Sequence, residues 1–138
     1  MPKVFTSERQ KIGELGEDLA VKFLMKHGFS IVERNYTRRM GEIDIIAKKQ
    51  GKLRFIEVKS LQRSLVSHET QQKASYTGNM FRPEDNMHPA KLKKMYRTME
   101  VYISEKGIAD LEWQIDLITV YIDMAQKKAR VEILENIV

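Results

Sequence analysis

Two acidic side chains and a lysine on neighbouring predicted strands are the residues of this sequence best suited to chemistry. Asp44 lies in a strand predicted over residues 42–48, and Glu57 and Lys59 lie in a strand predicted over 52–60. Alternate side chains of a strand point to the same face, so Glu57 and Lys59 share a face. Carboxylates bind hard divalent cations, and a lysine stabilises developing negative charge. Together the three residues suit a metal-dependent hydrolysis.

The turn between these two strands decides whether the acids meet. Gln50-Gly51, as a two-residue turn, sets Asp44 opposite Glu57. A loop of four residues keeps this register, whereas loops of three or five residues place Glu57 on the other face unless a bulge intervenes. In the first register we expect the two Cβ atoms to lie about 4.5–5.5 Å apart.

Opposed carboxylates repel each other, and apolar neighbours such as Ile45 and Val58 strengthen the repulsion. A divalent cation, a shared proton or Lys59 would neutralise the pair. Mg²⁺ suits such a site because it binds through one or two carboxylates and keeps several waters, one of which can attack a phosphate. The alternative interpretation is an exposed strand face on which Asp44 and Glu57 have no chemical role.

A helix precedes the strands and carries a further acid. Ser7 and Gln10 form a capping box, and Gly28 is placed to end the helix after about His27. Glu17 falls at the edge of the predicted apolar face of this helix. That face consists of Ile12, Leu15, Leu19 and Phe23, widened by the small residues Gly13, Gly16 and Ala20.

The remaining segments alternate in the manner of an α/β domain. Pro89 is placed in the first turn of a second helix, which we expect to run to about Lys106. The order α-β-β-β-α-β-β predicts a single domain over residues 1–138, with a mixed β-sheet flanked by helices. Further strands are predicted over residues 29–34, 113–123 and 129–138, and polar connections over 35–41 and 61–88. A connection as long as the last is usually functional or mobile.

The bulk composition fits a folded intracellular protein. Of 138 residues, 42% are hydrophobic and 31% are charged, which is typical of a globular chain. The absence of cysteine excludes disulfides and cysteine nucleophiles. No segment is apolar enough for a membrane span, and residues 1–7 lack the pattern of a signal peptide, so we expect a cytoplasmic location. The net charge of +5 favours polyanionic partners such as nucleic acid.

The motif around the two acids resembles that of a nuclease family. Gly41-Glu-Ile-Asp-Ile-Ile46 followed by Phe55-Ile-Glu-Val-Lys59 is similar to the core of the PD-(D/E)xK nucleases. Nearly the whole chain resembles the YraN-like bacterial family, a set of predicted endonucleases related to archaeal Holliday-junction resolvases. The resemblance implies a restriction-endonuclease-like fold. The supporting segments are Gly13-Glu-Leu-Gly-Glu17, Glu33-Arg-Asn-Tyr36, Lys91 and Ile115-Asp116.

The resemblance also implies roles for individual residues. Asp44, Glu57 and Glu17 would hold Mg²⁺ or Mn²⁺, and Lys59 would be the catalytic lysine. The implied activity is metal-dependent cleavage of DNA, including branched or structured forms, and junction resolution would require a homodimer with two active sites. One alternative is a nucleic-acid binding module that keeps the fold without cutting. Another is a scaffold whose acids form only a structural ion cluster with Lys59.

Basic and aromatic residues near the motif are further candidates, because cations that neutralise phosphates supply most non-specific affinity for nucleic acid. For each of them a solvated or packed structural role is an equal or stronger alternative. The basic candidates are Arg34, Arg38 and Arg39 before the second strand, and Lys91, Lys93, Lys94 and Arg97 in the second helix. The aromatic candidates are Tyr76 and Phe81. We interpret Asp116 as a buried structural acid and Trp113 as a core or interface residue, and we assign no role to Glu42.

Overall fold

The computed structural model describes residues 7–65 and 88–137, which form one five-stranded sheet and two helices. This arrangement confirms the predicted α/β class, the mixed sheet and the order of elements. The elements are α1 (Glu8–Lys26), β1 (Ser30–Arg38), β2 (Gly41–Lys49), β3 (Lys52–Gln62), α3 (Pro89–Lys106), β4 (Trp113–Asp123) and β5 (Lys128–Leu134).

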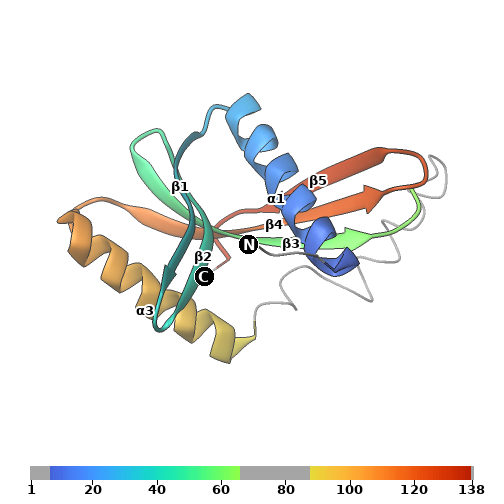
Figure 1. The fold of residues 1–138 in the computed structure, drawn as a ribbon. Coiled ribbons are helices and arrows are strands. Elements are labelled where there is room, and N and C mark those ends of the chain that lie inside the picture. Colours follow the sequence, from blue (N-terminus) through green and yellow to red (C-terminus); the bar gives the residue numbers. More distant parts are fainter. Residues whose placement is uncertain (1–6, 66–87, 138) are drawn as a thin grey trace, which may run out of the picture.

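The strands lie side by side in chain order, β1-β2-β3-β4-β5 (Figure 1). Only β3 and β4 run parallel, and the connection between them contains α3, as a parallel pair requires. No helix in residues 7–65 and 88–137 is long and apolar enough to cross a membrane.

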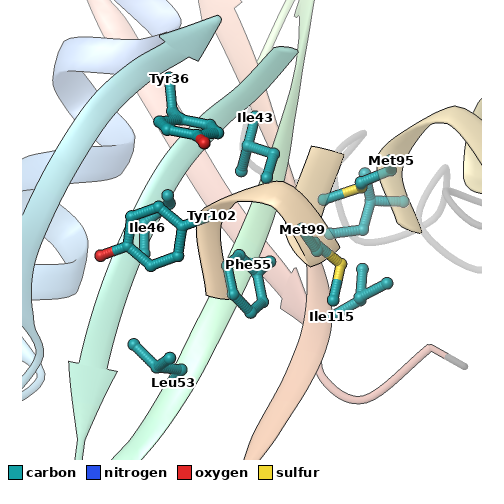
Figure 2. Packing of buried hydrophobic residues seen from close by; sticks show 10 residues of the cluster. Tyr36, Ile43, Ile46, Leu53, Phe55, Met95, Met99, Tyr102 and Ile115 are labelled. Atoms are coloured by element: carbon teal, nitrogen blue, oxygen red, sulfur yellow. The ribbon is translucent and has the colours of Figure 1, made fainter. Parts of the chain in front are cut away.

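Each face of the sheet carries its own hydrophobic core. Phe55 and Ile56 are neighbours in β3 and therefore point to opposite faces. Phe55 packs with Met99 and Tyr102 of α3 (Figure 2), whereas Ile56 belongs to the cluster that α1 covers. The sheet thus lies between the two helices, and a residue of the central strands faces one helix or the other.

Local signals place most element ends as predicted. Ser7 caps α1 through a capping box with Gln10. Gly28 follows the helix with a left-handed φ of 88°. Gln50 and Gly51 both have positive φ, as a tight hairpin turn of the predicted kind requires.

Three predicted boundaries are wrong. The polar connection expected over residues 35–41 is mostly strand, because Thr37 pairs with Glu42 and Arg38 with Gly41, so that only Arg39 and Met40 turn the chain. β5 ends at Leu134 rather than at residue 138. Of the long connection predicted over residues 61–88, residues 61 and 62 belong to β3, and residues 66–87 lie outside the described residues.

The buried face of α1 is rotated from the predicted stripe. Leu15 is 36% exposed, and the small residues Gly16 and Ala20 lie at the centre of the contact with the sheet. A Cβ atom on Gly16 would lie 1.8 Å from Ser60 Oγ, so the helix backbone approaches β3 as closely as a glycine permits. The predicted stripe has the small residues as its widening, whereas the close approach places Gly16 and Ala20 at the centre of the contact.

The ribbon of β1 and β2 changes faces part-way along its length. Arg34 pairs in register with Ile45, and Tyr36 pairs with Ile43. Ile45 belongs to the α1 cluster, whereas Tyr36 and Ile43 belong to the α3 cluster, so regular alternation fails between these positions. Ile43 and Ile45 therefore face opposite helices, although residues two apart in a regular strand share a face. The residue at the break is Asn35, whose φ of 52° is left-handed.

Candidate active site

Asp44 lies where β2 and β3 separate. The register predicted from the Gln50-Gly51 turn is confirmed as far as the pair Ile45 and Ile56, after which the ladder ends. Asp44 is consequently not a ladder partner of Glu57. Its Oδ2 accepts a hydrogen bond of 2.8 Å from the backbone N–H of Val58, which takes the place of a backbone bond between the strands.

The charge of Glu57 nevertheless acts on Asp44. Burial raises the pKa of Asp44 from an ordinary 3.8 to about 7, and the charge of Glu57 adds to the rise. The hydrogen bond from Val58 works in the opposite direction, and the charges of Glu17 and Glu42 raise the pKa further. Asp44 thus bears a charge that its own surroundings disfavour, as expected of a carboxylate placed to receive a cation or a proton.

Two clefts meet at Asp44. The larger, of about 790 Å³, lies beside α1 and is lined by Glu17, Arg34, Asp44 and Lys59 among others. The smaller, of about 360 Å³, lies beside α3 and is lined by Asp44, Glu57, Lys91 and Lys94 among others. Asp44 and Glu42 line both clefts, so two carboxylates lie where the two open spaces adjoin. The predicted residues Asp44, Glu57, Lys59 and Glu17 all border this pair of clefts.

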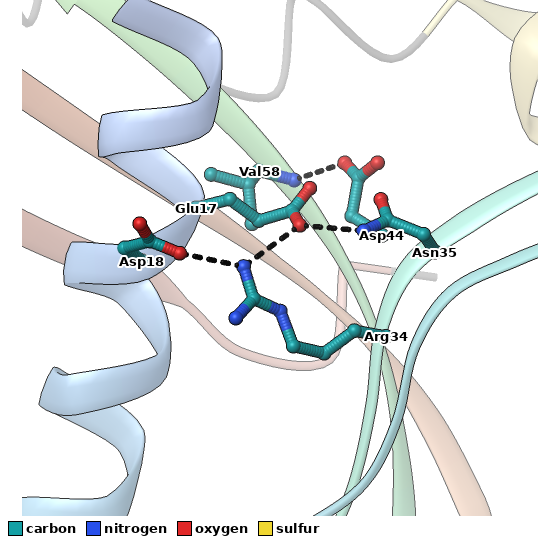
Figure 3. A network of polar contacts seen from close by, with 6 residues as sticks. All are labelled: Glu17, Asp18, Arg34, Asn35, Asp44 and Val58. Carbon is teal, nitrogen blue, oxygen red and sulfur yellow. Dashed lines mark hydrogen bonds and ion pairs between the residues drawn. The ribbon is translucent and has the colours of Figure 1, made fainter. Parts of the chain in front are cut away.

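Glu17 reaches the larger cleft from α1, where two residues of β1 hold it (Figure 3). Arg34 Nη2 lies 3.1 Å from Glu17 Oε1, and Asn35 Nδ2 donates to the same oxygen at 3.0 Å. Arg34 also pairs with Asp18 at 2.9 Å. Arg34, a candidate phosphate ligand by sequence, is thus an ion-pair partner of α1.

Glu57 reaches the smaller cleft and meets a cation there. Lys91 Nζ of α3 lies 2.6 Å from Glu57 Oε2. The Glu57 side chain is only 14% exposed, whereas that of Lys91 is 49% exposed. An ammonium group therefore already offsets one of the two opposed carboxylates.

The donor set fits a divalent cation that keeps much of its water. No group of three His, Asp or Glu side chains is close enough to enclose a metal within the described ranges, so Asp44, Glu57 and Glu17 do not form a ready-made cage. Mg²⁺ does not need one, because it is commonly bound through one or two carboxylates, with waters and phosphate oxygens completing the shell. Asp44 and Glu57 supply that pair.

The other basic candidates differ in what they contact. Arg38 binds Glu105 of α3 through Nε and Nη2, at 3.1 and 2.9 Å, and stacks on the Tyr36 ring, so it joins the hairpin to the helix. Arg39 is exposed in the β1–β2 turn. Lys94 lines the smaller cleft. Tyr76 and Phe81 lie outside the described residues.

Sequence reasoning missed two parts of the site. It assigned no role to Asn35, although asparagine adopts a left-handed backbone more readily than most residue types. It also gave no sign that Lys91 contacts Glu57, because the two lie on elements far apart in the chain. Asp116, interpreted as a structural acid, is buried away from both clefts and accepts hydrogen bonds from Gln114 and the backbone of Asn136.

Comparison with known proteins identifies the family. The model of the uncharacterised protein family UPF0102 matches residues 16–120, which span the site. The chain belongs to this family. The YraN-like family expected from the motif is thereby confirmed, whereas membership of the PD-(D/E)xK superfamily stays a prediction.

Relatives from several bacteria extend over most of the chain. A UPF0102 protein of Campylobacter jejuni (strain RM1221) is 41% identical over 114 residues, 83% of this chain and 87% of that protein. One from Helicobacter pylori (strain G27) is 37% identical over 135 residues, 98% of this chain and 97% of its own length. The names of these relatives state no activity.

A solved structure gives only a distant likeness. The match to the structure of Pyrococcus furiosus SfsA in complex with Ca²⁺ extends over 98% of this chain and 73% of the SfsA chain, at 10% identity and a TM-score of 0.34. A likeness of this size supports no inference about the site.

Proposed function

We propose that this protein is a metal-dependent endonuclease-type phosphodiesterase acting on DNA, with branched or structured DNA among its substrates. The observation that carries the proposal is the position of Asp44 at the junction of two clefts, next to a second, largely buried acid, Glu57. A protein gains no stability from opposing two carboxylates in a partly dry site, so a function that needs both explains their presence.

The chemistry assigns a part to each side chain. Asp44 and Glu57 would hold Mg²⁺ or Mn²⁺, with Glu17 as a further acid from α1. A cation held there supplies an activated water and offsets charge on the phosphate under attack. Lys59, on the wall of the larger cleft that Asp44 also lines, neutralises negative charge as the phosphorus–oxygen bond breaks. Attack by water breaks this bond directly, with no covalent enzyme intermediate.

Cations around the clefts suit a polyanionic substrate. Lys91 and Lys94 border the smaller cleft, and Arg9 borders the larger one. Contacts of this kind supply affinity for phosphates without regard to sequence. The alternative function, a nucleic-acid binding module that does not cut, uses these cations but has no need of the opposed acids.

Cleavage assays test the proposal. Purified protein is incubated with supercoiled plasmid, linear duplex, single strands and a four-way junction, each with Mg²⁺, Mn²⁺ or EDTA. We expect metal-dependent nicking or junction cutting that Asp44→Asn, Glu57→Gln and Lys59→Met each abolish. Matched controls are Glu100→Gln and Lys48→Met, which replace exposed residues away from both clefts.

The outcomes separate the two functions. DNA binding that persists in EDTA, with no cutting of any substrate in either metal, would replace the nuclease by the binding module. Cutting that survives Asp44→Asn and Glu57→Gln together would place the activity elsewhere or in a contaminant.

A further inference from the structure

We propose that Asn35 is a positioning residue, which sets the Glu17 carboxylate for metal binding through its amide and its left-handed backbone together. This inference rests on the proposed metal-dependent function. It gives a role in that function to Asn35, to which the sequence motif assigned none.

The first observation is the geometry of the two donors. Asn35 Nδ2 and Arg34 Nη2 both approach the same oxygen of Glu17, Oε1, at 3.0 and 3.1 Å. Figure 3 draws the second carboxylate oxygen of Glu17 pointing away from both donors. Two bonds to one oxygen fix the rotation of a carboxylate and leave the other oxygen to serve as a ligand.

The second observation is the backbone at Asn35. Neighbouring residues of a regular strand point to opposite faces, so Arg34 and Asn35 would not both reach α1. The φ of 52° at Asn35 breaks the alternation, and both side chains reach Glu17 while Tyr36 enters the α3 core. Asparagine is one of the few residue types that adopt this conformation readily and also carry an amide donor.

The third observation is that Arg34 is shared. Its Nη2 serves Asp18 at 2.9 Å as well as Glu17 at 3.1 Å, so it links two acids of α1 rather than holding one. The Asn35 amide is uncharged and brings no competing positive charge to an oxygen group intended for a cation. These properties make Asn35 the more specific of the two partners.

The test is a calorimetric titration of Mn²⁺ into the full chain, with and without a DNA duplex. Asn35→Gly keeps the left-handed backbone accessible and removes the side chain that carries the amide. Asn136→Gly is the matched control, because Asn136 has a φ of 54° and lies outside both clefts. We expect Asn35→Gly to weaken Mn²⁺ binding by about 10- to 100-fold, as loss of an outer partner of a metal ligand does, and Asn136→Gly to leave it unchanged.

A double variant shows whether Asn35 acts through Glu17. If it does, Asn35→Gly costs no further affinity once Glu17→Ala is present. Equal additional losses in the wild-type and Glu17→Ala backgrounds would overturn the inference, as would Mn²⁺ affinity in Asn35→Gly equal to that of the wild type. Asn35→Asp gives a second test, because it keeps the size and the left-handed tendency but places a negative charge beside Glu17 Oε1. We expect it to change the Mn²⁺ affinity by a larger factor than Asn35→Gly does.

The wild-type titration distinguishes this failure from that of the proposed function. If the wild type binds no Mn²⁺ with or without DNA, the metal-dependent function fails and the role of Asn35 fails with it. If the wild type binds Mn²⁺ and the Asn35 variants bind it with the same affinity, the positioning role alone is wrong. Thermal unfolding of Asn35→Gly and Asn136→Gly, followed by circular dichroism, should show similar midpoints.

Discussion

Asp44 and Asp116 are both acids in the middle of strands, but their surroundings differ completely. Asp116 is fully buried and accepts hydrogen bonds from Gln114 Nε2 at 2.7 Å and from the Asn136 N–H at 2.8 Å, with Arg54 Nη1 at 3.4 Å. Among the residues that the structure describes, Asp44 accepts one bond, from the N–H of Val58, and the charge of another carboxylate, Glu57, acts on it.

The difference teaches how to separate a structural acid from a candidate ligand. The partners of Asp116 are donors from the chain itself, and they attach the segment after β5 to β4, so its charge is compensated within the fold. The charge of Asp44 is opposed by Glu57 and by burial, and within residues 7–65 and 88–137 only the Val58 N–H stabilises it, so a cation or a proton from solvent would compensate it. An acid short of donors in an open cleft is therefore the better candidate for a cation ligand.

The largest effect expected from this comparison concerns activity. Asp44→Asn keeps the shape and the acceptor for Val58 but removes the charge, and we expect cleavage to fall by about 10³-fold, since a bound metal contributes several kcal/mol to the barrier. Asp116→Asn should leave cleavage per folded molecule nearly unchanged. Rates are measured on the best substrate and normalised to the folded fraction from circular dichroism. Equal losses in both variants would remove the distinction between the two acids.

The next effect concerns stability, for which we expect the Asp116 variant rather than the Asp44 variant to show the loss. Asp116→Ala leaves Arg54 with Glu135, at 3.3 Å, as its only ion-pair partner within the described residues, and removes the acceptor of the Asn136 N–H. We expect the free energy of unfolding to fall by about 3 kcal/mol, as when a buried pair loses one partner, whereas Asp44→Asn should not lower it. Urea unfolding followed by tryptophan fluorescence measures both. A stability loss in Asp44→Asn that matched Asp116→Ala would make Asp44 a structural acid as well.

A pH titration sharpens the comparison further. The pKa of Asp44 in the fold is about 7, above the ordinary 3.8, so the native state holds its proton where the unfolded chain has lost it. In metal-free protein, Asp44 therefore lowers the free energy of unfolding as pH rises from about 4 to about 7, and it causes no further change above that range. The same range should show metal binding strengthening with pH, because the cation competes with a proton. Asp44→Asn should lack both trends.

The smallest effect concerns the cation already present at the site. Lys91→Met removes the ammonium beside Glu57, and we expect Mn²⁺ affinity to rise by up to about fivefold, because an ion pair with one exposed partner is worth at most about 1 kcal/mol. Lys93→Met, on the exposed side of the same helix, is the control. Isothermal titration measures both. Weaker binding in Lys91→Met would mean that Lys91 supports the metal site rather than competing for Glu57.

How far the sequence predicts this site depends on the range of each signal. The hairpin register that brings Asp44 near Glu57 followed from the Gln50-Gly51 turn, because turn chemistry acts within a few residues. The end of the ladder just before Asp44 did not follow, because it depends on how the β1–β2 ribbon leaves the sheet toward α3. The face change at Asn35 escaped prediction for the same reason, since strict alternation was assumed along the whole strand.

The sequence by itself determined the caps of α1, the tight turn, the start of α3, the order of elements and the identity of the acids, all of which depend on residues close together in the chain. Only the tertiary structure decided which groups meet at the clefts. Gly16 brings α1 against Ser60, Asn35 and Arg34 hold Glu17, and Lys91 reaches Glu57 from α3. These contacts join elements distant in sequence, and they depend on packing distances that no local pattern contains.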